Sequence, residues 1–461
     1  MPSSAVAAFA RLVESRPPAR PALWFDSACV LGGSIAGLLA ARVLADRARQ
    51  VVVIERDAVN VDGRSRAGVP QDRQVHVMLP GGRRWLEHWL PGLTKDLQDQ
   101  GAVLGAPGQF VLYRDGRREV HEEPMLTASR PLFESRIRAR VLALPNVATR
   151  RSQVTGLDYR DGRVTAVRHR LGSGSGSGDV LPADFVVDAM GRGSRLADWL
   201  EADGYSVPPL QRLATSINYA TGLFKRTPPL VLNAAVALFS PPYPVDGVAV
   251  AGIGAIEHDQ WLVLLMGYDD SRPGRTLPAF KDTCAKLPPG FADAASDPVS
   301  DEIFTYHQAD SRRRDFTGRN RFPAGLVSVG DAVASFNPIY AQGMSAAALH
   351  AAALAEYLTT EPVPGQAATA FFELERVVVD AAWAFSAGGD AARLDALSGA
   401  EVPAEVSRQR WALEQLLRAA PVDAAVAQAV NDVTFMLAHP ETLADPALID
   451  RAVAANERHP G

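Results

Sequence analysis

Three glycine-rich turns carry the residues whose types and spacing point most directly to chemistry. The first, Gly32-Gly33-Ser34-Ile35-Ala36-Gly37, stands between an apolar strand and a helix. Gly32 permits a tight turn and Gly37 close helix packing, while the N–H groups and partial positive charge of a helix N-terminus attract a pyrophosphate. Glu55 ends the next strand, 18 positions after Gly37, where a carboxylate can bind a ribose hydroxyl. This pattern predicts a dinucleotide site.

Ser34 occupies the place of the middle glycine usual in such a turn, which leaves two other interpretations open. One is an ordinary α/β turn without a ligand. The other is the strained Gly-x-Ser-x-Gly turn of esterases, in which the serine is a nucleophile. Ala36 stands at the last glycine position of that pattern, and the turn follows the first strand of the nucleotide unit. We therefore interpret Ser34 as a tolerated substitution whose Cβ narrows the approach to the phosphates.

The elements that must position these turns follow from hydrophobic periodicity. A strand at 28–31, a helix from 35 to about 47 and a strand at 51–55 form a βαβ unit. Further strand–turn–helix units lie within 183–200 and 325–358, and a helix is predicted at 80–90. The segment from 154 to 171 is typical of a hairpin turning at 161–162, and the repeat GSGSGSG at 172–178 predicts a flexible loop tip.

Composition and charge exclude several classes of function. The chain has 461 residues, of which 47% are hydrophobic and 21% charged, with a formal net charge of -5. Its length predicts two domains or one large domain with an inserted lobe. Its charge gives no electrostatic reason to expect nucleic acid or an anionic membrane surface as partner. Two cysteines suggest a reducing compartment, nine scattered histidines show no metal-ligand spacing, and we find no signal peptide or membrane span. We expect a cytoplasmic protein without a metal site.

Longer motifs extend the pattern of the glycine turns. They are RAGVPQDRQVHVML at 66–79, VVDAMGRGSRL at 186–196, YATGLFKR at 219–226 and GDAVASFNPIYAQGMSAAAL at 330–349. From about 28 to 383 the sequence resembles the FAD-dependent monooxygenases with the hydroxybenzoate hydroxylase fold. Within that family it is similar to a bacterial natural-product branch that includes polyether epoxidases and the flavoprotein [4+2] cyclases of spirotetronate pathways.

The resemblance implies an α/β fold with a Rossmann-like FAD-binding domain, an inserted antiparallel β substrate lobe and a C-terminal helical region. Strands rich in β-branched and aromatic residues from about 205 and an Ala-rich helical pattern from about 366 agree with it. The predicted division is an N-terminal extension at 1–26, the first part of the FAD-binding domain at 27–204, the substrate-binding β lobe at 205–318, the second part of the FAD-binding domain at 319–365 and a helical cap at 366–461.

The resemblance also assigns cofactor contacts outside the first turn. It implies that Asp331 binds the ribityl chain of FAD and that the turn from Pro338 through Gly343 to Met344 faces the flavin pyrimidine edge. The helix N-terminus that follows this turn can stabilise the negative charge of reduced flavin.

The phosphate and adenine ends of FAD are assigned in the same way. Arg130 would approach the phosphates and the backbone of Val154 the adenine, and we count Arg56 beside Glu55 among the cofactor-binding residues.

Simpler roles stay open for Asp331, Arg130 and His76. Asp331 can be an ordinary helix cap, and Arg130 a solvated charge at a helix start. His76 can reach the flavin or the substrate, or be a structural histidine, while Trp261 is expected to pack in the lobe. The sequence identifies no catalytic residue.

We interpret the chain as an FAD-binding enzyme of secondary metabolism with a large hydrophobic, polyketide-like substrate. The resemblance implies monooxygenation, as epoxidation or hydroxylation through a flavin C4a-hydroperoxide, with NAD(P)H or a flavin reductase supplying electrons. One alternative is a non-redox [4+2] cyclase that forms a dialkyldecalin by holding a flexible chain in place, with FAD as a structural part. A flavin-dependent reductase or dehydrogenase is another. Ser34, Met190 and Ala341 depart from the family pattern and bear on whether FAD turns over.

Overall fold

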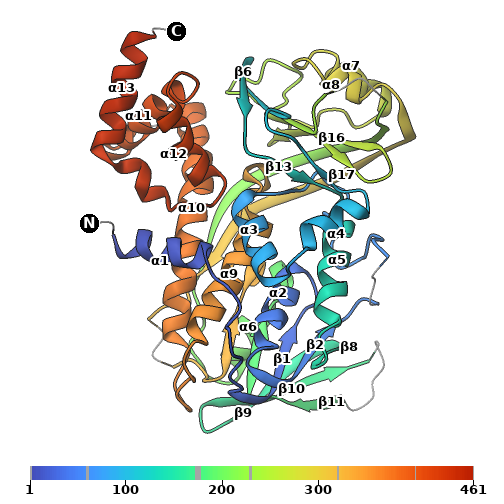
Figure 1. Ribbon diagram of the computed structural model, residues 1–461, viewed down its shortest axis with the longest axis vertical. Coiled ribbons are helices and arrows are strands. Elements are labelled where there is room, and N and C mark those ends of the chain that lie inside the picture. Colours follow the sequence, from blue (N-terminus) through green and yellow to red (C-terminus); the bar gives the residue numbers. More distant parts are fainter. Residues whose placement is uncertain are drawn as a thin grey trace.

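A five-stranded parallel sheet is one of the two large sheets of the molecule (Figure 1). The computed structural model describes residues 3–58, 62–171, 178–227, 231–318, 321–399 and 401–459. The strand order is β18-β12-β1-β2-β8, with adjacent strands parallel. Their bounds are β1 Phe25–Leu31, β2 Ala48–Glu55, β8 Val147–Arg151, β12 Phe185–Asp188 and β18 Leu326–Ser328.

The predicted βαβ unit is present with shifted boundaries. The helix α2 (Ile35–Leu44) ends before the expected position near 47, and β2 begins at Ala48 rather than at 51. The backbone oxygen of Arg47 accepts hydrogen bonds from the N–H groups of Trp24 and Phe25 at 2.8 and 3.1 Å, so the residue before β2 already pairs with the neighbouring segment. Sheet pairing therefore ends the helix early.

Helices cover the parallel sheet and join its turns. The helix α2 packs against α5 and α9, and α9 packs in turn against α3 and α10. The bounds of the helices in this layer are α3 Pro80–Trp89, α4 Leu93–Asp99, α5 Arg130–Leu142, α6 Leu196–Ala202 and α9 Gly343–Tyr357.

An eight-stranded sheet forms the second large layer, in the order β19-β17-β13-β16-β15-β14-β5-β6. All neighbours are antiparallel except β14 and β5, and β5 and β6 come from chain outside the predicted lobe at 205–318. The bounds are β5 Phe110–Arg114, β6 Arg117–His121, β13 Leu210–Lys225, β14 Ala234–Leu238, β15 Val250–Ile256, β16 Gln260–Tyr268, β17 Pro298–Arg314 and β19 Ala334–Ser335.

The two faces of this sheet pack against different partners. One face forms a core with α7 (Leu277–Cys284) and α8 (Phe291–Ala294), where Trp261 is buried as predicted. The other face carries a separate cluster, which we call the inner apolar face. It consists of Ile217, Tyr219, Ala249, Val250, Leu264, Met266 and Tyr268. Val75 and Ile339, from segments outside the sheet, pack against it.

Two small sheets make up the remaining sheet structure of the described residues. One contains the predicted hairpin, β9 (Gln153–Arg160) and β10 (Arg163–Arg170), with β11 (Asp179–Pro182). Its turn has positive φ at Asp161 and Gly162, the conformation that two-residue hairpins favour. The other contains β3 Val77–Met78, β4 Val103–Leu104 and β7 Leu126–Thr127. The predicted loop tip at 172–178 lies outside the described residues except for Gly178.

Helices dominate the C-terminal part, as predicted. The 30-residue α10 runs from beside the parallel sheet to the C-terminal helices, and the N-terminal α1 packs against α9 and α10 (Figure 1). The bounds are α1 Ser4–Val13, α10 Thr369–Ser398, α11 Ala404–Ala419, α12 Ala424–Thr434 and α13 Pro446–Arg458. Within the described ranges, every helix is too short or too polar to cross a membrane.

Candidate FAD site

The three glycine-rich turns meet at the carboxyl edge of the parallel sheet. Gly32, at φ +105°, lies so close to the turn after β12 that a Cβ would stand 2.5 Å from the Ala189 carbonyl oxygen. A Cβ at Gly330, after β18, would stand 2.5 Å from the Cβ of Ala36, and one at Gly37 only 1.9 Å from the Gly32 oxygen. Glycine is therefore required where the turns contact one another.

Ser34 stands at the N-cap of α2 but does not cap it. Its side chain makes no hydrogen bond to the helix N-terminus, and its hydroxyl instead donates to Oε2 of Glu134 at 2.6 Å. Glu55 accepts the Gly33 N–H at 2.8 Å. The first N–H groups of α2 have no partner within the helix, so they stay available to an anion.

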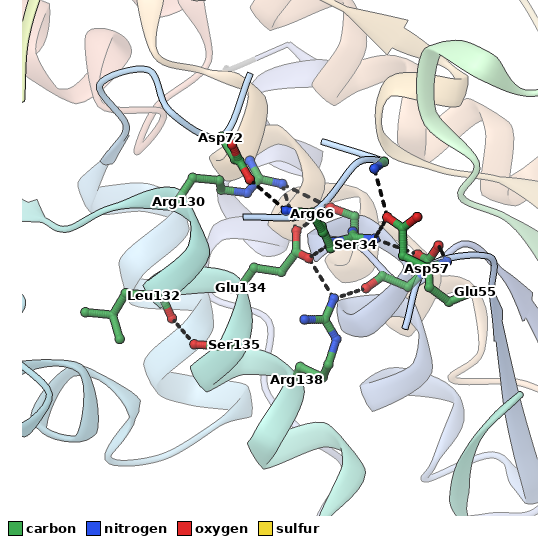
Figure 2. A network of polar contacts seen from close by, with 12 residues as sticks. Ser34, Glu55, Asp57, Arg66, Asp72, Arg130, Leu132, Glu134, Ser135 and Arg138 are labelled. Carbon is green, nitrogen blue, oxygen red and sulfur yellow. Dashed lines mark hydrogen bonds and ion pairs between the residues drawn. The ribbon is translucent and has the colours of Figure 1, made fainter. Parts of the chain in front are cut away.

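A compact group of charged side chains surrounds Ser34, and we call it the arginine–carboxylate cluster. Figure 2 shows it reaching from the loop after β2 to α5. Glu134 lies at its centre, 2.6 Å from Arg66 and 2.6 Å from Arg138. Arg66 also contacts Glu55 at 3.0 Å and Asp57 at 3.1 Å. The cluster consists of Glu55, Asp57, Arg66, Arg130, Glu134 and Arg138, three positive and three negative groups.

The charges of this cluster determine the protonation of its central carboxylate. Burial alone would raise the pKa of Glu134. The charges of Arg130, Arg66 and Arg138 and the hydrogen bond from Ser34 outweigh burial and lower the pKa to about 2. Glu134 is therefore ionised at neutral pH and acts only as a hydrogen-bond acceptor.

Arg130 is the least engaged of the three arginines. Its contacts to Ser34 and Glu134 are 3.1 and 3.5 Å long, and its buried Nε has no partner among the described residues. It begins α5 directly beside the N-terminus of α2. A pyrophosphate fits this arrangement, since free helix N–H groups, glycines and an arginine with an unpaired donor face the same place.

Asp331 lies in a short turn after β18 and makes no hydrogen bond to any residue that the structure describes. Burial raises its pKa, while the charges of Arg130, Arg192 and Arg312 oppose the increase. His350 supports this turn from behind, because its Nδ1 accepts the Gly330 N–H at 2.9 Å. The Asp331 carboxylate is thus held at the edge of the sheet with its oxygens available, as a ribityl contact requires.

The other predicted contacts are distributed around this edge. Val154, in β9, lies two residues after Ser152, whose backbone N–H donates to the backbone carbonyl oxygen of Glu55 at 2.9 Å. Arg56 is exposed and lies outside the arginine–carboxylate cluster. His76 bonds through Nδ1 to the Gln74 oxygen at 2.8 Å, and burial together with the charge of Arg130 lowers its pKa to about 3.

The turn before α9 has an unusual residue at its centre. Pro338 and Gly343 are exposed, and Met344 is buried. Ala341 has φ +53°, in the left-handed region that favours glycine.

Sequence reasoning missed Arg66, Glu134 and Arg138. A signal was present, because Arg130, Glu134 and Arg138 follow one another at four-residue spacing and therefore share one face of a helix. The partner across the fold, Ser34, is 100 positions away from Glu134. Local spacing does not predict that contact.

A second group of polar residues was also missed. Asn337, in the turn before α9, donates to Asp390 on α10 at 2.6 Å and to the Tyr268 hydroxyl at 3.3 Å. The guanidinium of Arg393 lies 3.8 Å from the centre of the Tyr268 ring. The sequence signal for this group was the presence of Asp390, Arg393 and two glycines, at 388 and 389, inside an Ala-rich helix.

Comparison with known proteins identifies the class of this fold and site. Residues 26–373 match the family described as an FAD binding domain. The chain is 35% identical over 347 residues to Protein Rv3254 of Mycobacterium tuberculosis (strain ATCC 25618 / H37Rv), covering 71% of each chain. Squalene monooxygenase SE1 of Panax ginseng is 29% identical over 170 residues, which are 34% of this chain and 29% of that protein.

Solved structures share the fold. A flavin-dependent brominase, Bmp2, superposes with a TM-score of 0.65 at 16% identity, over 94% of this chain and 99% of that one. The p-nitrophenol 4-monooxygenase PnpA from Pseudomonas putida DLL-E4 gives 0.57 at 21% identity, over 93% and 99%. The chain thus shares its fold with flavin-dependent enzymes of known structure. It belongs to the FAD binding domain family, and FAD is its cofactor.

Proposed function

We propose that this enzyme inserts one oxygen atom into a large apolar substrate of secondary metabolism, by epoxidation or hydroxylation, with NAD(P)H or a flavin reductase as the electron source. The inner apolar face carries this proposal. Its buried aliphatic and tyrosine side chains meet Val75 and Ile339, which adjoin His76 and Pro338 in segments predicted to lie near the flavin. An apolar ligand would gain from burial at this face.

The chain's own residues have separable tasks in this proposal. The N-terminus of α2 and Arg130 would hold the pyrophosphate, and Asp331 the ribityl chain. The inner apolar face would orient the substrate and exclude water. Bound FAD supplies the redox chemistry and the activation of oxygen.

The names of two relatives support an apolar substrate and epoxidation. The chain is 29% identical over 170 residues to a Panax ginseng squalene monooxygenase and also 29% identical over 170 residues to squalene epoxidase 3 of Arabidopsis thaliana. Both similarities cover about a third of this chain, so they support the class of substrate rather than squalene itself. We propose a polyketide-derived molecule.

Product mass tests the reaction type. The FAD-loaded enzyme would be incubated with apolar polyenes and aromatic polyketides, with and without NAD(P)H and air, and the products weighed. We expect a gain of one oxygen atom that requires both reductant and oxygen. A product of unchanged mass, formed without either, would overturn monooxygenation.

One observation favours a second function, the non-redox [4+2] cyclisation of a linear polyene with FAD as a structural part. Ala341, at φ +53°, stands in the turn expected to face the flavin, in a backbone conformation that favours glycine. Its Cβ would narrow the space in front of the flavin ring. The unchanged product mass that contradicts oxygenation is the result that supports this alternative.

A further inference from the structure

One face of α10 carries polar residues at helical spacing. We call these residues, with Asn337, Tyr219 and Tyr340 beside them, the α10 polar site. Ser386, Asp390 and Arg393 are separated by four and three positions, so they point the same way. Ser386 accepts the backbone N–H of Asn337 at 3.2 Å, and Asp390 accepts its side-chain amide at 2.6 Å. The helix therefore holds the turn that leads to α9.

One of the two glycines in the middle of α10, Gly389, is required for close approach. A Cβ at Gly389 would lie 1.9 Å from the hydroxyl of Tyr340, whereas a Cβ at Gly388 would meet nothing within 4 Å. Glycine inside a helix costs about 1 kcal/mol relative to alanine. Gly389 offsets that cost by giving the Tyr340 hydroxyl room beside Asp390.

The α10 polar site contains buried atoms without partners. Asp390 is 1% exposed and Tyr219 is 5% exposed, and within the described part of the chain neither Oδ2 of Asp390 nor the Tyr219 hydroxyl has a hydrogen-bond partner. Nε of Arg393 is also unpartnered. Leaving a buried polar atom unpaired destabilises the folded protein. Tyr219 and Arg393 both lie within electrostatic reach of Asp390, so these neighbouring unpaired groups point to a ligand that supplies the missing partners.

The site adjoins the inner apolar face. Tyr219 and Tyr268 belong to that face, and Ile339 beside Tyr340 packs against it. The negative charge of Asp390 acts on both of these tyrosines and on Tyr340. Burial raises the pKa of Asp390 to about 6, against the opposing effects of Asn337 and Arg393, so the carboxylate is mostly ionised at neutral pH.

The chemistry of the unpaired atoms selects one kind of ligand group. An ionised carboxylate accepts hydrogen bonds only, a guanidinium donates only, and a tyrosine hydroxyl does both. A ligand carboxylate would be repelled by Asp390, and a ligand ammonium by Arg393. A neutral hydroxyl can donate to Asp390 and accept from a neighbouring donor at once.

We propose that the α10 polar site binds a hydroxyl group of an otherwise apolar substrate, with Asp390 as its acceptor, and so fixes the substrate's orientation on the inner apolar face. This inference rests on the proposed function for the identity of the ligand as the substrate. It adds the substrate class: a phenol or alcohol attached to an apolar skeleton.

A matched pair of probes tests the proposal. Binding of 2-naphthol and of its methyl ether, 2-methoxynaphthalene, to the FAD-loaded enzyme would be measured by calorimetry. We expect at least about tenfold tighter binding of 2-naphthol, since one charge-assisted hydrogen bond contributes about 1.5–3 kcal/mol. Equal affinities, including no binding of either probe, would overturn the proposal.

Variants assign the preference to Asp390. Asp390→Asn keeps the size of the side chain and should abolish the preference for 2-naphthol, whereas Asp380→Asn, an exposed carboxylate on the same helix, should preserve it. A preference that survives Asp390→Asn in protein with wild-type circular dichroism and FAD content would contradict the proposal.

A second pair covers the case in which Asp390→Asn does not fold. Gly389→Ala should weaken binding of 2-naphthol because it displaces the Tyr340 hydroxyl, and Gly388→Ala should not. Equal effects of the two alanines would count against the site.

Calorimetry needs no turnover, which separates this inference from the proposed function. An enzyme that selects 2-naphthol through Asp390 and yet adds no oxygen to any product would keep the site and lose the monooxygenase proposal. An enzyme that adds oxygen to its product but binds 2-naphthol and its methyl ether equally well would keep the monooxygenase proposal and lose the site.

Discussion

The arginine–carboxylate cluster and the α10 polar site are both buried and charged, but they differ in how far their groups are paired. In the cluster, both oxygens of Glu134 and both of Glu55 accept hydrogen bonds or ion pairs. In the α10 polar site, Asp390 uses one oxygen, and the Tyr219 hydroxyl has no hydrogen-bond partner among the residues that the structure describes. Complete pairing stabilises a scaffold, whereas incomplete pairing marks positions that a ligand completes. Arg130 is the exception within the cluster, because its Nε has no partner among the described residues.

Glu134→Gln should have the largest effect if the cluster is a scaffold. The substitution leaves Arg66, Arg130 and Arg138 without their common counter-charge, and breaking a buried ion pair costs about 3–5 kcal/mol. Urea unfolding of the apoprotein measures the loss. Glu356→Gln, which removes an exposed contact to Arg11, should change stability by less than about 1 kcal/mol. Similar losses in both variants would show that the cluster is not a scaffold.

The pH dependence of stability sharpens the same point. The pKa of Glu134 is about 2 in the folded protein against an ordinary value of 4.5. Its contribution is therefore complete above pH 4.5 and lost as the pH falls towards 2, and it amounts to about 3 kcal/mol. We expect the stability difference between wild type and Glu134→Gln to shrink over this range. A difference that stays constant would mean that Glu134 is not held ionised by the arginines.

Gly37→Ala tests the contact between the first turn and its helix. A Cβ would lie 1.9 Å from the Gly32 oxygen, so α2 must move away from β1. We expect a loss of about 2–3 kcal/mol in unfolding free energy and weaker FAD binding in a fluorescence titration. Gly388→Ala is the control, as another helical glycine with open space around it. Unchanged FAD affinity in Gly37→Ala would argue against a pyrophosphate at this turn.

Arg130→Ala separates binding from folding inside the cluster. Because the Arg130 contacts are long and its Nε has no partner among the described residues, we expect FAD affinity to fall about tenfold or more while apoprotein stability falls by less than in Arg138→Ala. Arg138→Ala should mainly destabilise the fold, since Arg138 contacts Glu134 at 2.6 Å and the Gly33 oxygen at 2.7 Å. The opposite assignment of effects would make Arg130 structural.

Ala341→Gly, in the turn that leads to α9 and that α10 holds, should have the smallest effect on stability. A left-handed conformation costs an L-residue about 1–2 kcal/mol, and the greater flexibility of glycine in the unfolded chain offsets part of the gain. We expect thermal unfolding to show stabilisation by up to about 1 kcal/mol. Destabilisation would mean that the Ala341 methyl group has a packing role in the turn before α9.

The sequence by itself determined the features that are contiguous in the chain. The strand–turn–helix units around Gly32, Ala189 and Gly330 were predictable because strand, glycine and helix follow one another, and parallel strands bring such turns to one edge. The same local logic located the hairpin at Asp161 and Gly162. It misjudged the end of α2, where pairing of Arg47 with the neighbouring segment overrides helix periodicity.

Only the tertiary structure decided which distant residues meet. It brings Glu134 to Ser34 and Asp390 to Asn337, and it adds β5 to β14 as a parallel neighbour of a sheet formed by later strands. Hydrophobic periodicity predicts that a helix has a buried face but not what that face contacts. The pairing of buried charges depends on that contact, and so does the presence of an unpaired oxygen such as Oδ2 of Asp390.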